Sequence, residues 1–304
     1  MIDLVTVLGH TAAGKTAFAA HLADRLEGEI ISADSRQVYR GMDIGSGKDY
    51  KDYQVMDHQI PVHLIDILDA GYEYNVYLFK RDFLRVYTDI SERGMMPVLC
   101  GGSGLYIESV LRNYRLLNVP LNSGLREELA NKSTRELVEI LKLQGPLHNI
   151  TDTSNRKRMI RAIEIARYQS GQLHDSEDER ELNPLVLGIR FDRDTRRERI
   201  TLRLRERMEE GMVAEVEGLL QSGVPAEKLD YYGLEYRFVC KYIQEELSYE
   251  EMFKRLNTAI HQFAKRQMTY FRGMERKGIA IHWLDGALSK EEKIEQALEL
   301  FRAT

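Results

Sequence analysis

The chain has 304 residues, of which 43% are hydrophobic and 30% are charged, and its formal net charge is -5. This length accommodates one large α/β domain, alone or with a smaller insertion, and the composition supports a full hydrophobic core. No apolar run approaches the length needed to span a bilayer, so we expect no transmembrane helix, and the negative charge argues mildly against indiscriminate nucleic-acid binding.

The N-terminus and the cysteines indicate the cellular compartment. Asp3 precedes the first apolar run without a basic flank, so we expect no signal peptide. Cys100 and Cys240 lie far apart and lack metal-ligand spacing. Such isolated cysteines are typical of the reducing cytoplasm. We therefore expect a cytoplasmic protein, and we further expect a monomer.

A phosphate-binding loop is predicted at residues 9–16, with the sequence Gly-His-Thr-Ala-Ala-Gly-Lys-Thr. It lies between an apolar run at 4–8, which predicts a buried strand, and a helical pattern from residue 17. In this context the backbone N–H groups of the loop and of the helix N-terminus bind phosphate oxygens. Lys15 would add a positive charge, and the Thr16 hydroxyl would be a ligand for Mg²⁺. The expected phosphate-binding residues are Gly9, Thr11, Ala12, Ala13, Gly14, Lys15 and Thr16. The loop indicates a polyphosphate ligand without specifying ATP or a kinase.

Asp34 follows a second predicted strand at residues 29–33. Ligands of α/β sheets bind at the carboxyl ends of the strands, so we expect Asp34 to face the phosphate loop. Three roles stay open for it: a metal-binding carboxylate, a general base, or a helix N-cap. A further short strand is predicted at 63–68, and Asn75 is expected to cap a helix that ends near Arg93.

A second glycine-rich turn, at residues 101–104, follows a predicted strand at 97–100 and precedes a helix. It would bring further N–H groups to the same sheet edge, with the Ser103 hydroxyl beside the phosphates. A plain tight turn is the alternative.

Strand signals disappear between residues 114 and 183, where amphipathic helical patterns occupy 123–143 and 155–168. The second pattern places Arg158 and Arg161 side by side. Their basic surface is either a solvated helix face or a contact for a phosphate backbone. The acidic run at 175–179 is expected to be an exposed loop. We expect residues 114–183 to form an all-helical insertion in a core made of 1–113 and 184–304.

The C-terminal part returns to the α/β pattern with a strand at 185–189 and a helix from about Asp194. On this helix Arg199 and Arg203 lie one turn apart, which suits a shared anion. Residues 231–237 show no periodicity that decides their structure. Ser248 is expected to cap a helix that ends at Gly273, and a strand at 279–284 and a helix from 289 follow. The fold class predicted is α/β: a P-loop NTPase-like parallel sheet with helices on both faces and an all-helical insertion domain.

The chain resembles the tRNA dimethylallyltransferase family, also called tRNA isopentenylpyrophosphate transferases. The matching motifs extend almost from end to end, and their order and spacing are specific. They are the runs 9–16, 34–45, 63–66, 101–106, 158–164, 199–203, 233–237 and 265–272.

The resemblance implies that the loop binds dimethylallyl diphosphate rather than ATP, and that the insertion grips a tRNA anticodon stem. In this family, N6 of the adenine 3′ of the anticodon attacks the dimethylallyl group and diphosphate leaves, giving N6-isopentenyladenosine. The resemblance makes Asp34 the base, gives Lys15, Thr16 and Arg203 to the diphosphate with Mg²⁺, and lets Ser103 bind the bridging oxygen. The tRNA contacts it implies are Asp34, Ser35, Arg36, Gln37, Ser103, Arg126, Arg158, Arg161, Gly233, Arg237, Lys265, Arg266, Gln267, Thr269 and Arg272.

The chain departs from the family pattern at a few positions. Ser103 stands where Thr is usual, and Tyr270 stands where Trp is common. Gly47 and Asp49 interrupt the usual Thr-Ala-Lys-Pro run after Gly45. These changes affect the substrate loops more than the reaction.

Two other functions stay open. A P-loop small-molecule kinase would share the phosphate loop without needing the basic insertion. An adenylate isopentenyltransferase would share the chemistry but act on free AMP, ADP or ATP. A non-catalytic RNA-binding relative would be expected to lack Asp34 or Lys15, and both are present.

Overall fold

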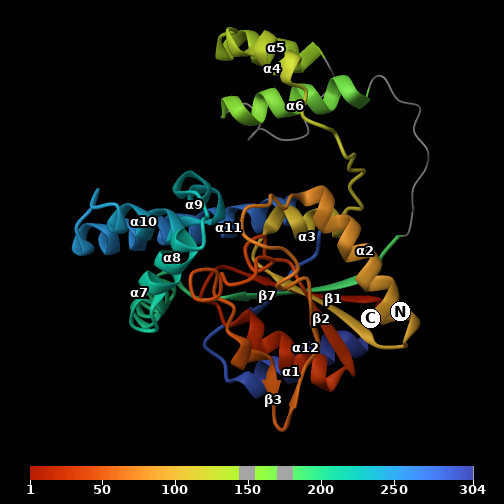
Figure 1. Cartoon of the computed structure of the whole chain (residues 1–304). Coiled ribbons are helices and arrows are strands. Elements are labelled where there is room, and N and C mark those ends of the chain that lie inside the picture. Colours follow the sequence, from red (N-terminus) through yellow and green to blue (C-terminus); the bar gives the residue numbers. More distant parts are fainter. Residues whose placement is uncertain (144–154, 170–180, 304) are drawn as a thin grey trace. The chain divides into compact units, whose positions relative to one another are not determined.

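The computed structural model describes residues 1–143, 155–169 and 181–303 (Figure 1). The chain forms two compact units. One is an α/β unit made of Met1–Tyr114 and Glu181–Thr304, and the other is a helical unit made of Arg115–Arg180. The acidic run at 175–179 lies outside the described residues. Among the described helices, none combines the length and the apolar character of a membrane span.

The α/β unit is built on a six-stranded sheet in which all neighbouring strands are parallel. The strand order is β5-β2-β6-β1-β7-β8. The strands are β1 (Leu4–Gly9), β2 (Gly28–Ser32), β5 (Val62–His63), β6 (Met96–Gly101), β7 (Pro184–Arg190) and β8 (His282–Asp285). Because β1, β2 and β6 are neighbours and parallel, the segments that follow them meet at one edge of the sheet. The predicted parallel sheet is confirmed.

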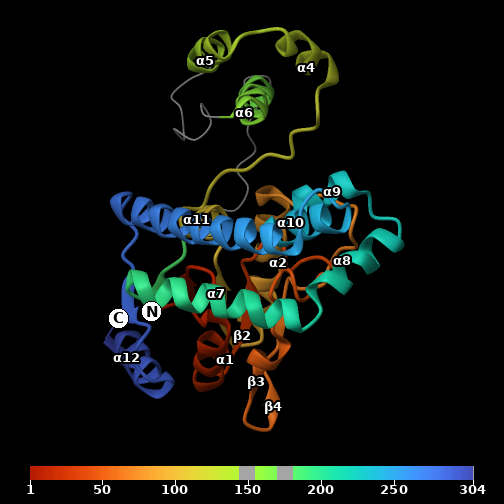
Figure 2. The same ribbon diagram turned by 90° about the vertical axis from the view of Figure 1, so that its left-hand side faces the viewer.

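Helices cover both faces of the sheet, as the continuous burial of its central strands requires. Figure 1 shows α1 (Lys15–Arg25) and α12 (Lys290–Ala303) on one face, and α2 (Val76–Glu92), α3 (Gly104–Leu111) and α11 (Tyr249–Arg276) on the other. The side chains of β1 alternate between the two cores: Leu4 and Leu8 belong to the cluster with α2 and α11, and Val5 and Val7 to the cluster with α1 and α12. Four further helices of this unit face the viewer, together with α11, in Figure 2. They are α7 (Arg193–Glu209), α8 (Met212–Gln221), α9 (Ala226–Tyr232) and α10 (Leu234–Ile243).

Two predicted helix starts are confirmed by their capping bonds. The Asn75 side chain accepts the N–H of Leu78 at 3.1 Å, and Ser248 forms a capping box with Glu251. The helix that begins after Ser248 passes Gly273 and ends at Arg276, so its predicted end was three residues short.

The strand predicted at 63–68 is wrong beyond its first residue, because β5 ends at His63. Leu64 and Asp66 have φ values of 62° and 53°, a left-handed conformation that a strand cannot accommodate. The turn is stabilised by the Asp66 carboxylate, which accepts hydrogen bonds from Lys48 and Tyr50. A 3-10 turn (Tyr50–Tyr53) and a small antiparallel hairpin, β3 (Gln54–Val55) with β4 (His58–Gln59), precede β5.

The helical unit contains α4 (Ser123–Ala130), α5 (Thr134–Leu143) and α6 (Arg156–Gln169) around a small leucine-rich core. The single helical pattern predicted at 123–143 is wrong, because two helices occupy it. Ser133 and Glu136 form a reciprocal capping bond that starts α5. Arg156 binds the carbonyl oxygens of Leu129 and Lys132, where α4 ends.

Candidate active site

The loop between β1 and α1 has the backbone geometry of an anion cradle. Gly14, with φ of 73°, is the residue before α1, and because it has no side chain it leaves the N–H groups of the helix N-terminus uncapped. Ala12 also has a left-handed φ, of 61°. A side chain at Gly9 would begin 2.8 Å from the carbonyl oxygen of Ile189. The loop therefore presents backbone N–H groups at a positive helix end, a site suited to phosphate.

Lys15 is half-buried and is directed back onto its own loop, where Nζ donates a hydrogen bond to the His10 carbonyl at 2.8 Å. Burial lowers the pKa of Lys15 to about 8, Arg203 acts in the same direction, and the nearby Cys100 and Asp34 oppose it. Diphosphate oxygens bound in this loop would place negative charge beside Lys15 and so favour its charged form.

The second glycine-rich turn packs too closely for side chains at three of its positions. A Cβ atom at Gly101 would lie 2.3 Å from the Ala33 carbonyl oxygen, one at Gly102 would lie 2.5 Å from Gln267, and one at Gly104 would lie 2.4 Å from Tyr270. The glycines thus allow the turn to lie against the segment after β2 and against α11.

Gln267 of α11 joins the two glycine-rich loops. Its Oε1 accepts the N–H of Thr11 at 2.9 Å, and its Nε2 donates to the carbonyl of Gly102 at 2.9 Å. The side chain is 8% exposed. Both ends of the amide are therefore engaged inside the protein, whereas the family resemblance implies that Gln267 contacts tRNA.

Asp34 and Ser103 lie beside each other at the end of β2 and β6. The Ser103 Oγ accepts the N–H of Ser35 at 3.2 Å, and the Asp34 Oδ1 accepts the N–H of Arg36 at 2.9 Å. Asp34 is also close enough to Lys15 to raise its pKa. The structure thus brings a carboxylate, a hydroxyl and an ammonium group to one sheet edge.

Three arginines of α7, spaced one turn apart, line the same region. Arg199 donates from Nε to the Ala12 carbonyl at 3.1 Å and stacks on Phe191. Arg203 pairs with Asp49. Arg207 is buried, and burial lowers its pKa. The one-turn spacing of Arg199 and Arg203 predicts a shared anion site, and the same four-residue spacing indicates Arg207, which was not among the predicted site residues.

The loop that carries Asp49 is held by Glu215, which was not among the predicted site residues. The Glu215 carboxylate accepts the successive N–H groups of Asp43, Ile44 and Gly45 at 2.8, 2.7 and 3.0 Å, and it also accepts the Tyr236 hydroxyl at 2.9 Å. No local sequence pattern marks Glu215 for this role.

Gln37, expected to contact tRNA, is also tied inside the protein. Its Oε1 accepts the Ser32 hydroxyl at 3.1 Å, and its Nε2 donates to the Gly47 carbonyl at 3.0 Å. Arg36, by contrast, extends over the ring of Tyr231, with 4.9 Å from its guanidinium carbon to the ring centroid.

The remaining residues assigned to tRNA in the α/β unit lie on α10 and α11. Gly233, with φ of 141°, separates α9 from α10 and supplies the turn in the segment that the sequence left undecided. Arg237 is exposed and pairs with Asp230 at 3.3 Å. Four exposed residues of α11 complete the set: Lys265, Arg266, Thr269 and Arg272.

In the helical unit, two of the expected tRNA contacts share one buried carboxylate. Glu164 accepts hydrogen bonds from Arg126 at 2.7 Å and from Arg161 at 3.1 Å. Burial alone would raise the pKa of Glu164, but these bonds and the N–H of Asn122 outweigh it and lower the pKa to about 2. Arg158 is exposed on the same helix. Arg126 and Arg161 therefore also hold the helical unit together.

Comparison with known proteins gives concordant matches along the whole chain. The model of the IPP transferase family matches residues 37–274, and that of the isopentenyl transferase family matches residues 2–60. A tRNA dimethylallyltransferase of Parabacteroides distasonis is 56% identical over 298 residues, which cover 98% of this chain and 97% of that protein. One of Trichlorobacter lovleyi is 55% identical over 286 residues, which cover 94% and 92%.

Two solved structures show the same architecture. The tRNA isopentenylpyrophosphate transferase of Bacillus halodurans aligns with a TM-score of 0.73 and 31% identity, covering 100% of this chain and 96% of that one. A eukaryotic dimethylallyltransferase that acts on tRNA aligns with a TM-score of 0.78 and 20% identity, covering 100% and 80%. The second likeness is one of fold.

Proposed function

This chain belongs to the IPP transferase family, and we propose that it transfers the dimethylallyl group of dimethylallyl diphosphate to N6 of the adenine 3′ of a tRNA anticodon. The observation that carries the proposal is the meeting of Lys15, Asp34 and Ser103 at one sheet edge, beside a phosphate-binding loop. Because tRNA is the proposed substrate, we also propose that the enzyme acts in the cytoplasm. Its action as a monomer stays a prediction.

The proposed reaction is a direct displacement. The lone pair of adenine N6 forms a bond to C1 of the dimethylallyl group while the C1–O bond breaks, and the electron pair of that bond leaves with diphosphate. The Asp34 carboxylate accepts the N6 proton, which makes the weakly nucleophilic amine more reactive. The Arg36 N–H fixes one oxygen of this carboxylate.

The leaving diphosphate gains negative charge as the bond breaks, so fixed donors act most strongly in the transition state. Lys15, Arg203 and the loop N–H groups would provide them. Ser103 fits the bridging oxygen, because its Oγ already accepts the Ser35 N–H and its own hydrogen remains to be donated.

The donor set also fits Mg²⁺. The described residues contain no group of three His, Cys, Asp or Glu side chains that would form a metal site by themselves. Mg²⁺ does not need one, because it usually keeps several waters and takes one or two protein oxygens with the phosphates of a substrate. The Thr16 hydroxyl, in the first turn of α1, is the protein oxygen that would hold it. When bound, the ion would neutralise charge on the diphosphate.

The test is to incubate the purified chain with tRNA, dimethylallyl diphosphate and Mg²⁺, without ATP, and to identify the tRNA nucleosides by mass spectrometry. We expect N6-isopentenyladenosine at the position 3′ of the anticodon. Parallel reactions with free AMP, ADP or ATP as acceptor test an adenylate isopentenyltransferase. An absolute need for ATP, or a phosphorylated product, would indicate a kinase instead.

A further inference from the structure

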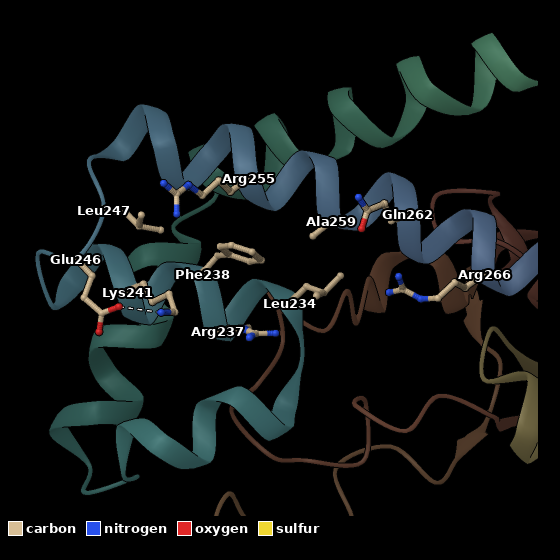
Figure 3. A pocket seen from close by; sticks show the side chains of 10 residues that line it. All are labelled: Leu234, Arg237, Phe238, Lys241, Glu246, Leu247, Arg255, Ala259, Gln262 and Arg266. Atoms are coloured by element: carbon tan, nitrogen blue, oxygen red, sulfur yellow. Dashed lines mark hydrogen bonds and ion pairs between the residues drawn. The ribbon is translucent and has the colours of Figure 1, made fainter. Parts of the chain in front are cut away.

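A cationic pocket with an apolar floor lies between α10 and α11, in the part of the α/β unit shown in Figure 3. Its volume is about 460 Å³, within the usual range of sites for small organic groups. Side chains of α11 form one wall. Along α11, Arg255, Ala259, Gln262 and Arg266 recur at helical spacing, and the small Ala259 leaves the central space open.

The floor of the pocket comes from the facing helix. Leu234 and Phe238 lie one turn apart on α10 and are half-buried. Leu247, in the connection between α10 and α11, closes one end and is buried. An aromatic ring beside aliphatic side chains offers a flat apolar surface against which a nucleic-acid base can stack.

Four cations surround this floor, and the acids that accompany them are weak competitors. Lys241 pairs with Glu246 at 2.8 Å and Arg255 with Glu251 at 3.6 Å. The four side chains of these two ion pairs are all more than a third exposed, with exposed fractions from 38% to 58%. Such exposed ion pairs contribute little to stability, because water and salt screen them. A phosphate can therefore replace the carboxylates at little cost.

The pocket is continuous with residues already assigned to RNA. Arg237 and Arg266, two of the residues expected to contact tRNA, are part of its lining. From Arg266 the α11 wall extends to Arg255, about 16 Å away at the rise of an α-helix. The positive surface thus continues along α11 from the proposed tRNA contacts.

We propose that this pocket binds a single-stranded nucleotide of the bound RNA, near the adenine that is modified. The base lies against Phe238 and Leu234, and the phosphates lie beside Arg255 and Lys241. The inference rests on the proposed function, since it names a further contact of the same RNA substrate.

The first test compares Arg255→Ala with Lys254→Ala in binding a labelled anticodon stem–loop RNA across a salt series. The two changes remove the same charge from neighbouring exposed positions of α11, but only Arg255 lines the pocket. We expect Arg255→Ala to weaken binding by roughly three- to tenfold and to reduce the salt slope by about 0.7, the value for one phosphate contact on a single strand. Lys254→Ala should match the unmodified protein. Equal effects of the two substitutions would overturn the proposal.

The second test locates the base. RNAs that carry the fluorescent base 2-aminopurine at single loop positions are titrated with the protein and with Phe238→Leu, which keeps an apolar side chain in the floor. We expect one position to change its fluorescence on binding, and Phe238→Leu to reduce that change. If no position responds to Phe238→Leu, the base does not occupy the pocket. If the protein modifies tRNA but neither test gives the expected result, only the proposal about the pocket is overturned. If the protein neither binds nor modifies tRNA, the proposed function itself is overturned.

Discussion

Asp49 and Arg203 form an ion pair in which the partner of the arginine is supplied by the loop after Gly47. Arg203 is 29% exposed and Asp49 is 40% exposed, so the pair is reachable by solvent. Arg203 is also close enough to Lys15 to lower its pKa. A diphosphate bound at Lys15 must therefore compete with the Asp49 carboxylate for the same guanidinium group. The family resemblance places Pro, which has no charge, where this chain has Asp49.

Replacing Asp49 with Asn should tighten the binding of inorganic diphosphate and of dimethylallyl diphosphate. The substitution removes a competing anion, and we expect a gain of about twofold to fivefold, in line with the strength of a half-exposed ion pair. Titration calorimetry measures the effect. Asp57→Asn, which removes the same charge from an exposed position before β4, is the control and should change nothing. Weaker binding by Asp49→Asn would mean that Asp49 orients Arg203 for the diphosphate.

Asp34→Asn tests the proton acceptor. The amide oxygen can still accept the Arg36 N–H, as the Asp34 Oδ1 does, so the local turn should persist. The substitution removes the proton acceptor, and single-turnover rates should fall by roughly 10²–10⁴-fold. Binding of dimethylallyl diphosphate should stay near normal. Weakened diphosphate binding with altered Mg²⁺ dependence would instead indicate a metal ligand. Unchanged turnover would leave Asp34 with only a capping role.

Local sequence signals predicted the elements that depend on neighbouring residues. The Asn75 and Ser248 caps act within three residues of themselves, and both were predicted. The reciprocal bond between Ser133 and Glu136 is equally local, so the break between α4 and α5 was readable in the sequence and was missed.

Contacts between distant parts of the chain were not accessible in this way. Gln267 binds the N–H of Thr11 across 256 positions, and Glu215 binds the N–H of Gly45 across 170. Nothing in the neighbourhood of either residue encodes its partner, because the sheet and the helices that cover it bring them together. The family resemblance implies that Gln267 contacts RNA, whereas in the structure its amide binds the Thr11 N–H and the Gly102 carbonyl.

Diphosphate binding should depend on pH through Lys15. Its pKa is about 8, below the ordinary value of 10.5, because burial disfavours the charged form. Bound diphosphate favours the charged form and raises this pKa. Affinity should then be nearly constant below pH 8 and should fall by up to about tenfold per pH unit above it. Calorimetry of dimethylallyl diphosphate binding between about pH 7 and about pH 9.5, a range that spans the pKa of Lys15, gives the profile.

Lys15→Arg is the control for this profile, because a guanidinium group does not titrate in the same range. If Lys15→Arg binds at all, its affinity should lack the decline above pH 8. The same decline in both proteins would assign the pH dependence to another group.

Gln267→Leu should loosen both glycine-rich loops at once. The substitution removes the partners of the Thr11 N–H and the Gly102 carbonyl, and leaving such groups unpaired costs about 1–3 kcal/mol of unfolding free energy. Trp283 is the only tryptophan, and its ring centroid lies 6.4 Å from that of Phe271 on α11. Its fluorescence can therefore report unfolding in urea. Diphosphate affinity should fall as well. Gln221→Leu, at an exposed position at the end of α8, is the control. If Gln267→Leu weakens only tRNA binding, the residue is an RNA contact, as the family resemblance implies.

Arg158 and Arg161 should separate RNA binding from the stability of the helical unit. Arg158 is exposed, so Arg158→Ala should weaken tRNA binding without changing stability. The slope of log affinity against log salt concentration should fall by about 1, the value for one phosphate contact. Arg161 binds both Glu164 and the Val119 carbonyl. Arg161→Ala should therefore reduce helical content and thermal stability as well as tRNA affinity, since buried Glu164 loses a partner. Circular dichroism and RNA titrations of both variants measure the two effects. Equal stability losses for the two variants would mean that Arg158 is structural too, and unchanged tRNA affinity with Arg158→Ala would make it a solvated helix face.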